Sequence, residues 1–423
     1  MSSGYRWVVL AVGTFAQASF AAVNIGLPAL APALRSHYSL SLTQIGVVLG
    51  AVSAGMMLTL LPWGIVADRI GERVVIVAGL TGAAVALAAL GWSGSFLSLV
   101  GLLAVAGVFG ARVNAASGRA VMSWFGRAER GLALGIRQTA IPLGGTVAAA
   151  SLPWVARADG LRTAFLALAV GCLAAAAAGG LWMRDPPIPP AHDHALETGP
   201  LRDPRMWLLS GGSSLLLVAQ ISNVFFLVLF LHQHRGVSAT TAAAVLAVTQ
   251  LLGAVARVAS GRWSDRTERR IVPLRQLAAA LGLTTALVAV LADAPLPVLV
   301  PVLVAAGTLG LSWNGLSFTA AAEAAGGARS GTAIGLQQTV LGLVVAAVPV
   351  AFAAIVGATS WRVGFALAAA CPLLGWLALA PLAERALQEG DRAAHDERAQ
   401  VEAEEHGVSP AIEPAHPESM TGL

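Results

Sequence analysis

The sequence predicts an all-α membrane protein in which twelve transmembrane helices form two pseudo-symmetric six-helix bundles. The 423-residue chain is 57% hydrophobic and only 11% charged, whereas soluble domains carry about 25% charged residues. Twelve apolar stretches approach the length of about 20 residues that a bilayer-spanning helix needs. Landmarks also recur at an interval of nearly 200 residues, which indicates two halves of similar structure.

Each expected helix is an apolar stretch between short polar segments. In chain order the twelve stretches are 7–30, 43–66, 74–92, 97–122, 132–156, 163–182, 206–231, 239–263, 271–292, 298–322, 332–356 and 363–383. The expected regions are an N-terminal bundle (1–182), a cytoplasmic linker (183–205), a C-terminal bundle (206–383) and a tail (384–423). The tail is acidic and has no apolar period, so we expect it to be a disordered cytoplasmic segment.

The internal repeat rests on three pairs of landmarks. Asp68 and Asp265, each inside a G-x-x-x-D-R frame, are 197 residues apart. The stretch 133–139 returns as 333–339, 200 residues later, with the shared pattern A-x-G-x-x-Q-T. The stretch 161–165 returns as 361–365 at the same offset, with the shared pattern R-x-x-F. Several landmarks at one interval indicate the parallel-repeat plan of a large class of transporters.

The decapeptide G-I-V-A-D-R-I-G-E-R lies between the second and third apolar stretches. So short a polar loop belongs at a membrane face, because its backbone groups would have no partners in hydrocarbon. It resembles the signature loop of the major facilitator superfamily, G-x-x-x-D-R-x-G-x-R, and matches it at Gly64, Asp68, Arg69, Gly71 and Arg73. The second copy keeps Gly261, Asp265 and Arg266 but has Glu268 in place of the second glycine. The resemblance covers roughly residues 5–385 and implies the fold of that superfamily.

The resemblance also implies a gating role for both loops. Asp68 would accept hydrogen bonds from the start of the eleventh helix near Gly331, and Asp265 from the start of the fifth near Gly131, because a helix N-terminus favours negative charge. Gly64 would allow close helix approach. The alternative is that the loop arginines only anchor the topology.

Arginines in the loops predict the orientation, because cytoplasmic loops are enriched in basic residues. One set of loops, together with the termini, carries most of them. The few on the opposite side are Arg35, Arg157, Arg162, Arg235 and Arg362. We therefore expect both termini on the cytoplasmic side of the cell membrane.

Composition argues against several other classes of protein. The 26 basic residues are all arginine and are scattered over loops and spans, without the basic face that nucleic-acid binding requires. Cys172 and Cys371 are too few for a disulfide framework. The sequence contains no nucleotide loop, metal cluster or nucleophile constellation, so we predict no enzyme, no cofactor and no metal. The expected partners are the lipid bilayer and a small-molecule substrate, and we expect a monomer.

We single out four arginines inside predicted spans, because charged side chains there are costly and usually functional. They are Arg112, Arg119, Arg137 and Arg257. The only acidic residue expected within a span is Glu323, near the cytoplasmic end of the tenth. A net positive interior argues against a carrier of organic cations. It suits an anion, because arginine offers a bidentate fork to a carboxylate or similar oxyanion.

Arg257 precedes Gly261 and Asp265 in the pattern R-x-x-x-G-x-x-x-D. This spacing resembles the eighth helix of monocarboxylate and oxalate carriers, and the resemblance implies that Arg257 contacts a substrate carboxylate. The alternative is that Arg257 snorkels or pairs with Glu323 near the cytoplasmic face.

The other intramembrane arginines have both substrate and structural interpretations. Arg112 lies near mid-span beside Asn114, and we expect contact with the cavity. Arg119 is about two turns closer to the cytoplasm and fits a structural ion pair. Arg137 either contacts the cavity or braces the preceding loop, and the stretch 124–136 resembles the loop between the fourth and fifth helices of the monocarboxylate-type branch.

Uncharged polar residues in both halves are further candidates for lining a central cavity. They are Gln17, Asn24, Gln138, Gln220, Asn223, Trp313, Asn314, Gln337 and Gln338. The alternative for each is a hydrogen bond between helices.

The leading hypothesis is a secondary transporter that moves a small organic anion, such as a carboxylate, by alternating access. The second is an efflux pump for drugs or hydrophobic compounds. Leu103 stands where many proton-coupled members have arginine, and Ile141–Gly145 only partly matches the antiporter signature, which weakens the second hypothesis. A non-transporting sensor with this fold is a third possibility, for which the featureless tail gives no support.

Overall fold

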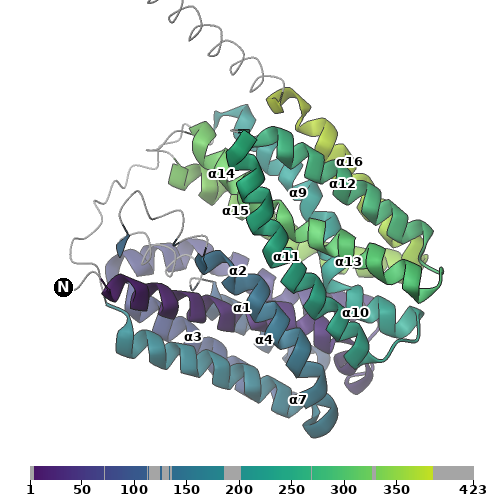
Figure 1. The fold of residues 1–423 in the computed structure, drawn as a ribbon. Coiled ribbons are helices and arrows are strands. Elements are labelled where there is room, and N and C mark those ends of the chain that lie inside the picture. Colours follow the sequence, from purple (N-terminus) through teal and green to yellow (C-terminus); the bar gives the residue numbers. More distant parts are fainter. Residues whose placement is uncertain are drawn as a thin grey trace, which may run out of the picture. The chain divides into compact units, whose positions relative to one another are not determined.

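The computed structural model describes residues 4–70, 72–111, 113, 124–125, 133, 136–184, 202–267, 269–325 and 330–383, with the backbone alone at 60–70, 72 and 330–332. The chain divides into two units, Met1–Leu379 and Ala380–Leu423. Every helix named below lies in the first unit, and the described residues form helices without strands (Figure 1).

The N-terminal half contains five described helices. They are α1 (Tyr5–His37), α2 (Leu42–Ile70), α3 (Glu72–Leu90), α4 (Phe96–Gly110) and α7 (Ala140–Trp182). Helix α7 joins the expected span 163–182 and the expected span 132–156 from Ala140 onward in one element, which turns at Gly160, whose φ of 85° suits a residue without a Cβ. Helix α1 continues to His37, beyond the expected end at residue 30.

The C-terminal half has two helices that are interrupted. Its elements are α9 (Pro204–Phe225), α10 (Leu227–Leu229), the π-helix η1 (Phe230–His234), α11 (Ala239–Thr267), α12 (Ile271–Val290), α13 (Leu296–Ser312), α14 (Asn314–Ala325), α15 (Ser330–Ala358) and α16 (Trp361–Ala378). The expected seventh span thus becomes α9, α10 and η1, and the tenth breaks at Trp313 into α13 and α14. Neither break was predicted from the sequence.

Several helix starts follow the rules of N-capping, in which a side-chain oxygen accepts a hydrogen bond from a free backbone N–H. Ser95 caps α4 in a capping box with Ser98. Asp203 caps α9, with Pro204 in the first turn. Ser360 caps α16 by accepting from the Val363 N–H.

In the described part of the chain, ten helical segments are long and apolar enough to cross a membrane, and Phe96–Gly110 is a shorter apolar helix. One of the ten, Ile136–Trp182, has 47 residues, which is about 70 Å of helix against about 30 Å of hydrocarbon. Its turn at Gly160 allows two crossings. The expected number of twelve crossings stays a prediction.

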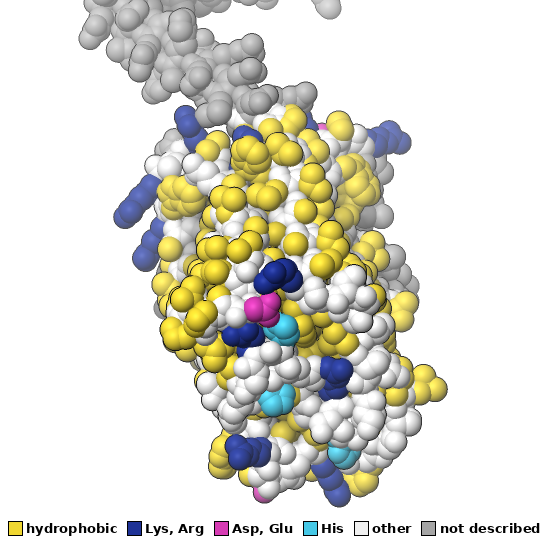
Figure 2. All heavy atoms as spheres, turned by 90° about the vertical axis from the view of Figure 1, so that its right-hand side faces the viewer, with side chains coloured by type: hydrophobic (Ala, Val, Ile, Leu, Met, Phe, Trp, Pro, Cys, Tyr) yellow, Lys and Arg dark blue, Asp and Glu magenta, His cyan; other side chains and the backbone are white. Residues whose placement is uncertain are grey.

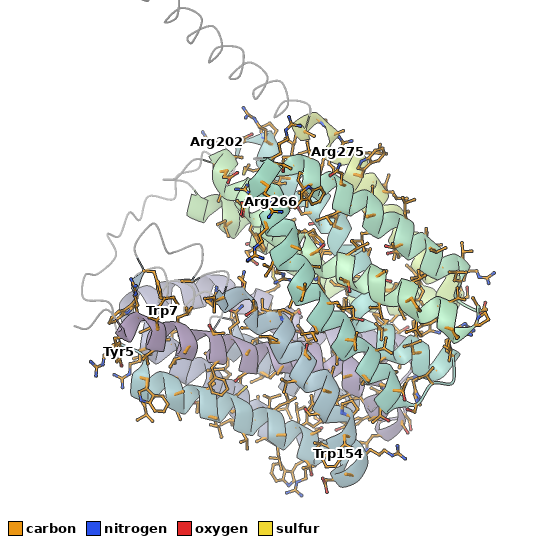
Figure 3. The ribbon with its side chains drawn as sticks, viewed as in Figure 1. Tyr5, Trp7, Trp154, Arg202, Arg266 and Arg275 are labelled. Carbon is orange, nitrogen blue, oxygen red and sulfur yellow. The ribbon has the colours of Figure 1, made fainter. Side chains whose placement is uncertain are left out.

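The two ends of the helices can be told apart by their contacts. At the Tyr5 end, where α1 begins, the Tyr5 hydroxyl donates to the Trp182 carbonyl at 2.8 Å. At the Tyr38 end, where α1 stops, Tyr38 donates to the Ser93 carbonyl at 3.0 Å. Exposed aromatic side chains occur toward both ends, with Trp7 at the first and Trp154 at the second (Figure 3), as in membrane-interface belts.

The halves meet chiefly along two helix pairs, α2 with α15 and α7 with α11, and α1 also contacts α9, α10 and α11. A Cβ on Gly46 of α2 would lie 2.4 Å from the Pro349 carbonyl oxygen, and one on Gly50 would lie 2.8 Å from that of Ala346. Glycine therefore permits backbone-to-backbone contact between the halves, as is common between helices in membranes. Because α2 and α11 carry the two G-x-x-x-D-R frames, the two pairs involve helices that the expected sequence repeat would relate.

Candidate functional site

Arg257 lies on α11 and is held against the break between α13 and α14. Its Nε donates to the Leu311 carbonyl at 3.1 Å. Ser260, one turn further on, donates to the Ser312 carbonyl at 2.7 Å. A helix end leaves carbonyls without intrahelical partners. Arg257 and Ser260 supply those partners here, so the sequence of α11 stabilises the break in its neighbour.

The outer nitrogens of Arg257 remain available. Among the described residues, the side chain of Arg257 makes one hydrogen bond, from Nε to the Leu311 carbonyl. No carboxylate of the described residues lies within ion-pair distance of its guanidinium. Glu323, which the sequence offered as an alternative partner, pairs with Arg270 instead, with Nε 3.1 Å from Oε1. The Nη1–Nη2 edge of Arg257 is therefore a free fork of the kind that binds carboxylates in bidentate fashion.

Polar residues of α9 and α14 lie beside the same break. The Asn314 amide donates to the Gln220 Oε1 at 3.2 Å. A Cβ on Gly310 would lie 3.1 Å from the Gln220 Cα, so α9 approaches α13 closely. Trp313, at the break itself, is fully buried, and its indole N–H has no hydrogen-bond partner in the described structure. These predicted residues and Arg257 thus gather at the same helix break.

The N-terminal half contributes a smaller polar group. Gln17 of α1 donates from Nε2 to the Gln138 Oε1 at 3.2 Å. Arg137 is buried, with 4% of its surface exposed. Asn24 has a buried Oδ1 without a described partner. Arg112, Asn114 and Arg119, which the sequence placed in the fourth span, lie outside the described residues.

Two of the predicted cavity residues hold helices together. Gln337 donates to the Ser317 hydroxyl at 2.6 Å, and that hydroxyl lies 2.5 Å from the hydroxyl of Ser213. Asn223 donates to Thr285 at 2.9 Å. These bonds fit the alternative of helix–helix hydrogen bonding. Gln338 is exposed and makes neither of these contacts.

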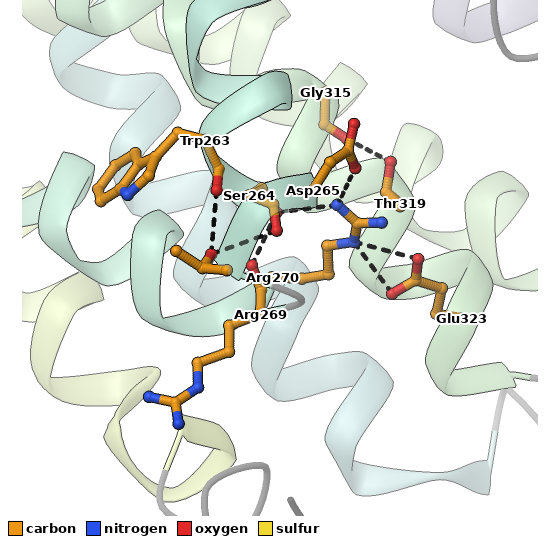
Figure 4. Close-up of polar contacts among 9 residues, drawn as sticks. Trp263, Ser264, Asp265, Arg269, Arg270, Gly315, Thr319 and Glu323 are labelled. Atoms are coloured by element: carbon orange, nitrogen blue, oxygen red, sulfur yellow. Dashed lines mark hydrogen bonds and ion pairs between the residues drawn. The ribbon is translucent and has the colours of Figure 1, made fainter.

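The second loop copy forms an ion network within the C-terminal half (Figure 4). Arg270 binds Asp265 through Nη1 at 2.5 Å and Glu323 through Nε at 3.1 Å. Burial lowers the pKa of Arg270, but the hydrogen bonds and charges of these two carboxylates outweigh it and raise the pKa above its ordinary value. Ser264 donates to the Arg269 carbonyl and fixes the turn.

The predicted gating contacts stay predictions. Gly131 and Gly71 lie outside the described residues, and only the backbone is described at Gly64, Asp68, Arg69 and Gly331. Arg73 donates to the Gly180 carbonyl of α7, a contact within its own half. Arg266 is exposed, and a Cβ on Gly261 would meet nothing within 4 Å.

Gln250 is a buried polar residue that the sequence analysis missed. It is fully buried, and neither atom of its amide has a hydrogen-bond partner in the described structure. A Cβ on Gly145 of α7 would lie 3.1 Å from its Nε2, so Gln250 sits in the contact between the halves. It precedes Arg257 by seven residues and therefore shares its helix face, about 10 Å away. That spacing was the signal available in the sequence.

Two cavities open toward the ends of the helices. One of about 340 Å³ is lined by Trp263, Thr267, Arg269, Val272, Pro273 and Gln276. The other, of about 420 Å³, lies at the Tyr38 end. Arg257 lines neither of these two cavities.

Helical segments this long and apolar indicate a multi-pass membrane protein. Residues 10–349 match the family model for the Major Facilitator Superfamily, and the chain belongs to that superfamily.

The chain is 35% identical to Rv2994, an uncharacterised MFS-type transporter of Mycobacterium tuberculosis, over 88% of this chain and 84% of the relative. It is 26% identical to SauU of Cupriavidus necator, a probable sulfoacetate transporter, over 85% and 89%. Among solved structures, it resembles a bacterial homologue of the human lysosomal transporter Spinster in an inward-facing, occupied conformation. That likeness has a TM-score of 0.72 at 17% identity, over 91% of this chain and 98% of the other.

Proposed function

We propose that this protein is a secondary transporter for a small organic anion, such as a carboxylate, and that Arg257 binds the anionic group. The observation that carries the proposal is the free Nη edge of Arg257, on a membrane-spanning helix and without a described carboxylate partner. The monocarboxylate and oxalate carriers that share the R-x-x-x-G-x-x-x-D spacing place an arginine at the same point.

The energetics support a substrate as the counterion. A charged residue at the centre of a membrane helix costs about 2.5–3.5 kcal/mol on insertion scales. The single bond to the Leu311 carbonyl satisfies one of the five N–H donors of the guanidinium. A carboxylate or sulfonate bound at the Nη edge would offset more of this cost through charge-assisted hydrogen bonds. The probable substrate of SauU, sulfoacetate, carries both kinds of anionic group.

The proposed transport cycle is alternating access. Several contacts between the halves lie from the middle of the helices toward the Tyr38 end: Gly46 with Pro349, Gly50 with Ala346, and Arg35, which donates a hydrogen bond to Gln233. We assign the Tyr5 end to the cytoplasm from the arginine-rich loops. On this assignment, the state described here is closed on the external side.

The test is uptake of radiolabelled small carboxylates and sulfonates by proteoliposomes containing the purified protein. Arg257→Gln should raise the substrate concentration that gives half-maximal uptake tenfold or more, because a charge-assisted bidentate contact is lost. Arg262→Gln is the matched control, since Arg262 is exposed on the same helix. Uptake that is indifferent to Arg257→Gln would overturn the proposal. Extrusion of hydrophobic dyes by the same vesicles would support the efflux alternative.

A further inference from the structure

A cavity of about 420 Å³ at the Tyr38 end lies between the two halves. The N-terminal half lines it with α1 and α7, and the C-terminal half with residues around η1 and the first turn of α11. The lining residues are Ala29, Leu30, Pro32, Ala33, Ser36, Pro153, Ala156, Arg157, His232, Ser238, Ala239 and Thr240. This end faces the viewer in Figure 2, where basic and histidine side chains stand among apolar ones and acidic side chains are few.

The lining combines one fixed positive charge with an apolar wall. Arg157 makes no hydrogen bond or ion pair within the described structure, and none of the described residues that line the cavity is acidic. Leu30, Pro32 and Pro153 supply apolar surface, whereas Ser36 and Thr240 supply hydroxyl groups. A guanidinium with unused donors beside apolar surface suits an anion that has a compact apolar body.

His232 adds a second polar group whose tautomer the backbone fixes. Its Nδ1 lies 2.8 Å from the Val237 carbonyl oxygen. Since a carbonyl only accepts, Nδ1 carries the hydrogen. Nε2 is then left without a described partner, and it accepts a hydrogen bond when the ring is neutral or donates one when the ring is protonated.

We propose that this cavity, which we name the seam cavity, is a binding site for small aromatic or aliphatic carboxylates, separate from Arg257. The carboxylate would pair with Arg157 of α7, and the apolar body would pack between α1 and the residues that follow η1. Such a ligand contacts both halves at once. Because the seam cavity exists only while the halves meet at the Tyr38 end, an occupant favours that state and inhibits transport. The inhibition rests on the proposed alternating access, whereas the binding itself does not.

Binding can be measured by protection of a thiol at the rim. Cys172→Ala and Cys371→Ala remove the two native thiols, and Ser36→Cys places one thiol at the exposed edge of the seam cavity. The rate of labelling by a membrane-impermeant maleimide is measured in proteoliposomes with benzoate or with its neutral isostere benzamide. We expect benzoate to slow labelling and benzamide to leave it unchanged. Equal protection by both compounds, or none by benzoate, would overturn the proposed site.

Two arginines on the same helix provide the matched comparison. Arg157→Gln should raise the benzoate concentration needed for half-protection about tenfold, because the charge-assisted contact is lost. Arg162→Gln should leave it unchanged, since the Arg162 guanidinium lies over the Trp92 ring, 4.3 Å from its centroid. The labelling rate without ligand shows whether each variant keeps the fold around Ser36→Cys. Full protection in Arg157→Gln would show that the cavity binds apolar groups without selecting anions, and it would contradict the proposal.

The same assay separates this site from the proposed substrate site. In Arg257→Gln, benzoate should still protect the thiol with unchanged half-saturation, even if transport is lost. Loss of protection in Arg257→Gln would show that protection follows from binding at Arg257, and the seam cavity would then not be a separate site. Failure of Arg257→Gln to affect uptake would contradict the proposed function and leave the protection result unaffected.

Discussion

Arg257 and Arg270 are thirteen residues apart in the sequence, and both reach toward the tenth predicted span, but their surroundings differ. Arg270 binds the carboxylates of Asp265 and Glu323 and the hydroxyl of Ser264. Arg257 binds one backbone carbonyl, that of Leu311. A guanidinium whose charge is neutralised by protein carboxylates acts within the fold. One that keeps its charge and its outer donors is available to a ligand.

The largest effect should come from changing the shape of the cation at Arg257. Arg257→Lys keeps the positive charge but loses the planar fork, and an ammonium is not equivalent at a bidentate site. We expect the anion concentration that gives half-maximal uptake into proteoliposomes to rise about tenfold in Arg257→Lys and further in Arg257→Gln. The order wild type, lysine, glutamine is the informative result. If Arg257→Lys transports as well as the wild type, the planar fork does not matter at this position and charge alone explains the role of Arg257.

Ser260 should matter for the helix break that holds Arg257. Ser260→Ala leaves the buried Ser312 carbonyl without its donor, which costs about 1–3 kcal/mol. We expect Tm in nanodiscs to fall by a few degrees, since about 1 kcal/mol shifts Tm by roughly 2–4 °C for large domains. Ser260→Thr, which retains the hydroxyl, is the control and should keep most of the stability. An unchanged Tm in Ser260→Ala would mean that the break does not need this donor.

The ion network of Arg270 should contribute less, because its carboxylates are exposed. The side chains of Asp265 and Glu323 are 68% and 53% exposed, and exposed pairs are worth about 0–1 kcal/mol. We expect Asp265→Asn and Glu323→Gln each to lower Tm by no more than about 4 °C. If the loop also gates transport, Asp265→Asn lowers the maximal uptake rate without changing half-saturation. A change in half-saturation would place Asp265 in contact with substrate and would remove the contrast between the two arginines.

The sequence predicts the helices better than it predicts their partners. Apolar length alone locates the spans, because a bilayer demands about 20 apolar residues whatever the neighbours are. The break at Trp313 is missed because no proline marks it. The carbonyls that it frees, those of Leu311 and Ser312, receive hydrogen bonds from side chains of α11, a helix far away in the sequence. For the same reason Glu323 was offered to Arg257, although it binds Arg270. The sequence identifies the charges inside the bundle, whereas the pairing depends on distances between helices.

The smallest effect concerns a carboxylate at the Tyr38 end that is shared by several cations. Asp293 lies 2.7 Å from His234 Nε2 and 3.0 Å from Arg362 Nη2, with Arg235 at 3.8 Å. The hydrogen bond from His234, followed by the charges of His234, Arg362 and Arg235, lowers the pKa of Asp293 below its ordinary value. A carboxyl whose pKa is lower in the folded state contributes stability at higher pH. That stability is lost as the pH falls through the lowered pKa.

We therefore expect Asp293→Asn to lower Tm slightly near neutral pH, and the difference from wild type to shrink below about pH 4. Thermal unfolding in nanodiscs across this pH range measures it, with Asp159→Asn as the control, because Asp159 is an exposed carboxyl of α7 beside the turn at Gly160, at the same end. A difference that is constant with pH would mean that the charge of Asp293 does not matter to folding. A difference that grows as the pH falls would contradict the direction of the pKa shift, and with it the assignment of Asp293 as the counterion of this cluster.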